Sequence, residues 1–214
     1  MNRCQSLYKL RTTFDARLDR LERRLGITSS LSPHQRDPVV AYVAVEALNG
    51  WSQFSKAFYL SCALNARTES KVRVQTTPLV LNMDDAIGRA VLLYKPRSTP
   101  NSLGQWQRRD EPTWHDPAVL MRVCLNINCS LHPQMQAAFS TGQQVFTDLP
   151  VFRNFYGHRN RLSSAAAQNL SPRYLLPSNL RPSEILLKAG PRASTSVLVE
   201  WIAELKFTAE FLCG

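Results

Sequence analysis

Glycine is scarce in this sequence and never clustered. Its eight glycines stand singly among 214 residues, so no phosphate-cradling loop or dinucleotide fingerprint can be drawn from them. A Gly-x-Ser-x-Gly motif, which marks the nucleophile of many hydrolases, is also missing. These absences exclude the common nucleotide-loop and serine-hydrolase motifs.

Long apolar runs are absent as well. The most hydrophobic long segment, residues 39–64, is interrupted by Glu46, Asn49, Gln53 and Lys56, which makes it too polar to cross a bilayer. The first 14 residues hold no apolar stretch typical of a signal peptide. We therefore expect a cytoplasmic protein that does not contact the membrane.

Cysteine occurs five times at irregular spacing, at positions 4, 62, 124, 129 and 213. An odd number argues against a disulfide framework and favours a reducing compartment. The spacing of Cys124, Cys129 and His132 resembles that of zinc ligands, but no fourth ligand lies nearby in the sequence. We predict buried thiols there, with no bound metal and no cofactor.

Positive charge is the main compositional excess. The chain has 26 Lys and Arg against 16 Asp and Glu, a formal net charge of +10. A basic surface concentrates polyanions such as nucleic acids. Charge alone does not separate a nucleic-acid partner from a merely basic soluble protein.

Apolar residues recur at helical spacing through most of the chain, and strand-like alternation is nearly absent. Asp37 suits the cap of the second predicted helix, and Pro38 suits its first position. We expect an all-α helical bundle. The predicted helices cover about 6–25, 38–64, 84–94, 116–131, 134–147, 149–170 and 195–212.

Residues 66–115 form a loop-rich insertion within an expected single domain over 1–214. Residues 71–75, KVRVQ, are the one candidate for a short edge strand. The segment 95–114 is crowded with Pro, Ser, Gly and charged residues, which is typical of an exposed loop. Such a loop is either structural or touches a substrate.

The informative segment is Val151–Leu162, VFRNFYGHRNRL. It places Arg153 and His158 in an Arg-x4-His arrangement, with the polar Asn154 directly after the arginine. This pattern, late in an all-helical chain, resembles the signature of the HEPN superfamily. Ribonucleases of that superfamily carry an arginine, a polar residue and then a histidine four to six residues beyond the arginine.

The resemblance implies a HEPN-type bundle that acts as an endoribonuclease without a metal. It also implies a homodimer in which the motif helices pack around a two-fold axis and pool their arginines and histidines. RNA is the implied substrate, and a 2′,3′-cyclic phosphate is the implied product. The class suggests a toxin or antiviral effector restrained by an antitoxin or sensor protein.

The chemistry suits these residue types. Histidine titrates near neutrality, so His158 can take the 2′-hydroxyl proton and later protonate the leaving 5′-oxygen. The Arg153 guanidinium offers a planar fork of donors to the phosphate oxygens, and Asn154 could orient the phosphate or the imidazole. Five helical residues turn through about 500°, so the two side chains lie about 140° apart on a straight helix. Either the helix is irregular near Gly157 or a second copy completes the site.

Other residues are candidates for supporting roles. Glu46 and Asn49 interrupt the apolar second helix, where they either bond to neighbouring helices or reach toward the motif. The aromatic residues around the motif suit a dimer contact or the core. The candidates for a second layer or for RNA contact are Glu46, Asn49, Tyr156, Arg159 and Asn160.

Two alternatives stay open. The same fold serves non-catalytic modules that bind nucleotides or act as scaffolds, and an intact motif does not guarantee turnover. A basic helical DNA-binding regulator is the other alternative, although no pair of helices joined by a short turn resembles a recognition element.

Overall fold

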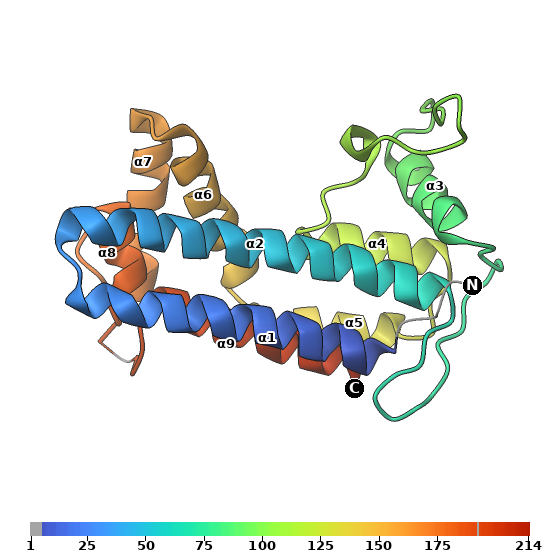
Figure 1. The fold of residues 1–214 in the computed structure, drawn as a ribbon, viewed down its shortest axis with the longest axis horizontal. Helices are drawn as coiled ribbons and strands as arrows, with labels where there is room; N and C mark the ends of the chain where they lie inside the picture. The colour runs from blue at the N-terminus through green and yellow to red at the C-terminus, as the bar shows by residue number, and fades with distance from the viewer. Residues whose placement is uncertain (1–5, 192) are drawn as a thin grey trace. The chain divides into compact units, whose positions relative to one another are not determined.

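The computed structural model describes residues 6–191 and 193–214. Within these residues the chain forms nine α-helices and three 3₁₀-helices (Figure 1), and no strand. The all-α expectation is therefore confirmed. The helices are α1 (Leu7–Gly26), η1 (Ile27–Ser30), α2 (Pro33–Ala63), α3 (Met83–Tyr94), η2 (Arg108–Asp110), α4 (Pro117–Asn126), α5 (His132–Phe139), α6 (Val145–His158), α7 (Arg161–Gln168), η3 (Ser171–Tyr174), α8 (Pro182–Leu187) and α9 (Val197–Cys213).

The chain divides into two compact units. The first unit comprises Met1–Phe14, Trp51–Gly142 and Thr208–Gly214, and the second comprises Asp15–Gly50 and Gln143–Phe207. Helices α1, α2 and α9 each contribute residues to both units. The expectation of a single domain over the whole chain stays a prediction.

The first unit has an aromatic core along the second half of α2. Phe14 stacks on Phe54 with ring centroids 4.7 Å apart, and Trp51 stacks on Phe54 at 5.3 Å. Tyr59 donates a hydrogen bond to the Ala86 carbonyl of α3, so burial of its ring leaves no unsatisfied hydroxyl. Trp51, Phe54, Phe58 and Tyr59 of α2 are all buried in this core.

The predicted insertion at 66–115 holds ordered structure. Asn82 caps α3 by accepting a hydrogen bond from the Asp85 N–H, 2.9 Å away. Trp106 packs so closely on Gly88 that a Cβ there would lie 2.7 Å from the indole nitrogen. The strand suggested at 71–75 does not form: the segment makes only an isolated antiparallel bridge between Arg73 and Arg67.

The second unit has its core between α6 and α9. Phe152 meets Trp201 edge-on with ring centroids 5.5 Å apart. Asp148 is 1% exposed and accepts hydrogen bonds from the Arg173 guanidinium at 2.6 Å and the Tyr174 hydroxyl at 2.7 Å. These bonds satisfy a carboxylate that would otherwise be costly to bury.

Several predicted helix boundaries are wrong. Helix α2 begins at Pro33, so Asp37 and Pro38 lie inside it and Asp37 is not its cap. The helix predicted over 134–147 ends at Phe139 as α5, and the helix predicted over 149–170 is two helices, α6 and α7, of which α6 already begins at Val145. Helix α8 lies between 170 and 195, where no helix was predicted. Helices α2 and α8 begin at Pro33 and Pro182, and only tertiary contacts decide which proline of the chain begins a helix.

Candidate nucleic-acid site

The predicted motif lies on α6 of the second unit. Phe152 is fully buried and Tyr156, one turn later, is 9% exposed. These two positions define the inner side of the helix. Of the positions between them, Phe155 is half-buried, whereas 153 and 154 face solvent. The three motif side chains are all exposed: Arg153, Asn154 and His158.

Arg153, Asn154 and His158 make no side-chain hydrogen bond or ion pair within residues 6–191 and 193–214. Helix α6 continues without interruption through Gly157 to His158. On such a helix Arg153 and His158 are separated by a rise of about 7.5 Å and an angle of about 140°. One copy of the chain therefore presents both groups to solvent without bringing them together.

The helix ends immediately after His158. Arg159 adopts the left-handed conformation, with φ 44° and ψ 37°, and its N–H donates to the Phe155 carbonyl. Asn160 then caps α7 by accepting from the Ser163 N–H at 2.8 Å, while the Ser163 hydroxyl accepts from the Asn160 N–H. This reciprocal capping is the reason why the predicted single helix is divided.

A chain of hydrogen bonds fixes the buried side of the motif. The Tyr156 hydroxyl donates to the Ser183 hydroxyl at 3.2 Å, and Ser183 donates to the Asp37 carboxylate. The other oxygen of Asp37 accepts from the Arg159 guanidinium at 2.8 Å. Burial raises the pKa of Tyr156, so its hydroxyl stays protonated and acts as a donor. Tyr156 and Arg159 thus anchor the end of α6 to α2 and α8.

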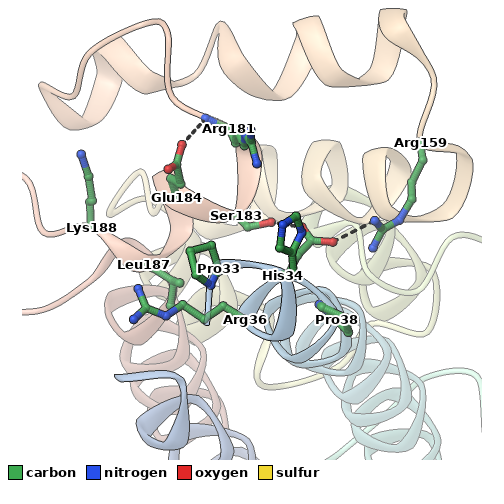
Figure 2. Close-up of a pocket in the computed structure, with 11 residues that line it drawn as sticks. Pro33, His34, Arg36, Pro38, Arg159, Arg181, Ser183, Glu184, Leu187 and Lys188 are labelled. Carbon is green, nitrogen blue, oxygen red and sulfur yellow. Dashed lines mark hydrogen bonds and ion pairs between the residues drawn. The ribbon is translucent and has the colours of Figure 1, made fainter. Parts of the chain in front are cut away.

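A cavity of about 630 Å³ opens beside this chain of hydrogen bonds (Figure 2). Its walls come from the first turns of α2, from Arg159, and from α8 with its flanking residues. Basic side chains are prominent among the lining residues, and we call this cavity the cationic pocket. It is lined by Pro33, His34, Arg36, Asp37, Pro38, Arg159, Arg181, Ser183, Glu184, Leu187 and Lys188.

Glu46 and Asn49 take part in a hydrogen-bond network with α1. The Glu46 carboxylate accepts from Arg17 of α1 at 2.7 Å and from the Asn49 amide at 3.1 Å. Hydrogen bonding from Asn49 and the positive charge of Arg17 lower the pKa of Glu46. Neither residue contacts the motif within the described parts of the chain.

The cysteine thiols described in the first unit are buried, as predicted for Cys124 and Cys129. Cys62, Cys124, Cys129 and Cys213 are all buried and unbridged, and Cys4 lies outside the described residues. Burial raises the pKa of the Cys62 thiol, and hydrogen bonding to Cys129 together with burial raises that of Cys124. Among the residues with described positions, no three His, Cys, Asp or Glu side chains form a group that could hold a metal ion.

Sequence reasoning did not find the cationic pocket. The sequence pattern predicts Asp37 as a helix cap and predicts no helix around Arg181 and Ser183. The signal that could have revealed this segment is the Arg-Pro-Ser-Glu sequence at 181–184, with proline at the first helical position and glutamate two residues later. The Glu184 carboxylate indeed accepts from the Arg181 N–H at 2.8 Å.

No family model, no curated protein and no solved structure matches this chain. None of the helices in the described residues is long and apolar enough to span a membrane.

Proposed function

We propose that this protein is a metal-independent endoribonuclease of the HEPN type, and that it works as a cytoplasmic homodimer. The observation that carries the proposal is the state of Arg153, Asn154 and His158. All three are exposed on one helix and make no side-chain hydrogen bond or ion pair with any residue that the structure describes. A buried or ion-paired motif would have argued for a structural role instead.

The proposed reaction is a transesterification within the RNA chain. His158 removes the proton of a 2′-hydroxyl group, whose oxygen attacks the adjacent phosphorus and forms a 2′,3′-cyclic phosphate. The bond to the 5′-oxygen breaks, and an imidazolium returns a proton to that oxygen. Arg153 binds the phosphate oxygens as their negative charge grows, and Asn154 orients the phosphate.

The separation of the two side chains is the reason to propose a dimer. Because Arg153 and His158 diverge by about 140° on a regular helix, one copy offers them to different directions. A two-fold arrangement of two α6 helices lets the arginine of one copy approach the histidine of the other. An antitoxin or sensor protein would restrain such an enzyme in the cell, and we propose a toxin or antiviral role.

The test is cleavage of RNA by the purified protein in the presence of EDTA. Wild type should cut mixed tRNA and mRNA and leave 2′,3′-cyclic phosphate ends, whereas Arg153→Ala and His158→Ala should not cut. RNA with 2′-O-methyl groups should resist cleavage, because its attacking oxygen carries no proton to remove. Arg20→Ala and His132→Ala are matched controls outside the motif and should cut normally. Equal cleavage by both motif variants and wild type would reject the assigned site.

A non-catalytic nucleotide-binding or scaffolding module is the second candidate. The divergence of the two motif side chains within one copy favours it, because a monomer could not assemble both groups on one phosphate. The same assay separates the two functions. A protein that is monomeric in solution and leaves RNA intact under all conditions would support the module.

A further inference from the structure

The cationic pocket has a charge that its own residues do not balance. Its lining includes the four basic side chains Arg36, Arg159, Arg181 and Lys188, against the two carboxylates Asp37 and Glu184. Without counting His34, the lining carries two surplus positive charges. Basic groups gathered at one hollow repel one another, so a bound anion would stabilise the arrangement.

Both carboxylates are already engaged. Asp37 accepts from Arg159 on one oxygen and from Ser183 on the other. Glu184 accepts from the backbone N–H of Arg181, as the dashed line in Figure 2 shows. Arg159 thus neutralises Asp37, whereas Glu184 bonds only to a neutral N–H. Its single negative charge offsets one of the three remaining positive charges of the lining, which leaves the surplus of two.

The basic side chains of α8 and its flanks are available to a ligand. Arg181 and Lys188 are exposed, and their side chains make no ion pair with any described residue. Arg36 is half-buried, and its guanidinium donates to the Leu31 carbonyl at 2.7 Å and to the Ser29 carbonyl at 3.5 Å, which fixes its position. The pocket thus combines one fixed and two free cations.

Part of the remaining lining is apolar. Pro33, Pro38 and Leu187 provide side-chain surfaces without hydrogen-bonding groups, and His34 and Ser183 complete the lining. Sites for small molecules usually have volumes of about 300–1,000 Å³, apolar walls and a few convergent polar groups. The pocket, at about 630 Å³, has this composition.

We propose that the cationic pocket binds a nucleoside phosphomonoester. A phosphomonoester carries nearly two negative charges near neutral pH, which matches the surplus of the lining. Guanidinium groups donate two parallel hydrogen bonds to phosphate oxygens. The flat base and the sugar lie against the prolines, Leu187 and the imidazole. The inference goes beyond the proposed ribonuclease and does not depend on it.

Two sources supply this chemistry, a free nucleotide and the phosphorylated end of an RNA strand. Isothermal titration calorimetry of the full chain distinguishes them with four probes. These are AMP, adenosine, a 2′-O-methyl RNA ten-mer with a 5′-phosphate, and the same ten-mer with a 5′-hydroxyl. AMP should bind and adenosine should not. Tighter binding of AMP than of the phosphorylated ten-mer assigns the pocket to a free nucleotide, and the reverse order assigns it to a strand end.

Substitutions locate the binding site. Arg181→Gln and Lys188→Gln each remove one charged donor to the phosphate, so each should weaken AMP binding by about tenfold or more. Both side chains are exposed, so the melting temperature should not change. Arg20→Gln, an exposed arginine of the same unit away from the pocket lining, should bind AMP like wild type. Absence of AMP binding, or unchanged binding by both pocket variants, would overturn the proposal.

The outcome is separable from that of the ribonuclease proposal. His158→Ala should bind AMP as wild type does, because His158 does not line the pocket. A protein that binds AMP through Arg181 and Lys188 but cuts no RNA would reject only the ribonuclease. A protein that cuts RNA but binds no phosphomonoester would reject only the pocket.

Discussion

Arg159 and Asp37 form an ion pair of 2.8 Å that joins the end of α6 to the first turns of α2. The two residues are 122 positions apart in the sequence. Asp37 uses its second oxygen to accept from the Ser183 hydroxyl, which is itself buried. The guanidinium of this pair is therefore the more exposed group, and the carboxylate beside Ser183 is the more protected from solvent.

This asymmetry predicts unequal effects of the two alanine substitutions. Arg159→Ala removes a partly exposed charge and should lower the free energy of unfolding by about 0.5 kcal/mol. Asp37→Ala also removes the acceptor of a buried hydroxyl and should cost about 1–2 kcal/mol. Urea unfolding measures both. High salt should shrink the Arg159→Ala effect and leave most of the Asp37→Ala effect, whereas equal losses would contradict the asymmetry.

The boundary between α6 and α7 gives a second prediction. Asn160 accepts from the Ser163 N–H and holds the first turn of α7. Asn160→Ala should lower the free energy of unfolding by about 1 kcal/mol, the usual cost of a lost cap. Asn169→Ala, at the other end of α7, is the matched control and should change it by less than about 0.5 kcal/mol. A loss at Asn169 as large as that at Asn160 would show that capping is not the cause.

A third prediction concerns pH. Burial raises the pKa of Glu204, whose carboxylate accepts from the Val145 N–H at the start of α6. A raised pKa in the folded state means that folding favours the neutral acid, so stability from this group is present at low pH. It is lost as the pH rises through the folded-state pKa.

Glu204→Gln keeps an acceptor for the Val145 N–H and removes the charge. The variant should therefore gain stability over wild type at pH 7 and lose that advantage as the pH falls below the ordinary range of glutamate. Chemical unfolding at several pH values measures this difference. An advantage that grows toward acid pH would contradict the sign of the argument.

Local sequence patterns predicted the helices whose limits depend on residues close to one another in the sequence. Helix α3 follows an asparagine cap, and the apolar periodicity of α1 gave its limits nearly to the residue. The start of α2 was wrong because Pro33 and Pro38 both suit a helix start. The partners that hold Asp37 inside the helix, Arg159 and Ser183, are more than 100 residues away, beyond the reach of local patterns.

The candidate site, too, could be predicted only in part from the sequence. The spacing of Arg153 and His158 on a helix could be predicted, and so could their separation in angle. The exposure of the motif side chains was not predicted, because the sequence left open whether the aromatic residues around them pack in the core; the structure buries Phe152 and Tyr156. The cationic pocket could not be predicted, because it is assembled from three segments distant in sequence, at 33–38, 159 and 181–188. Tertiary packing alone decides which basic side chains line the same cavity.

In the proposed mechanism, an arginine and a histidine from two copies of the chain act on one phosphodiester. Differently tagged Arg153→Ala and His158→Ala chains can be co-expressed and their mixed dimer purified through both tags. The mixed dimer keeps one intact arginine and one intact histidine on opposite copies, so it should cut RNA that neither parent variant cuts. A mixed dimer as inactive as its parents, beside an active doubly tagged wild type, would contradict the claim.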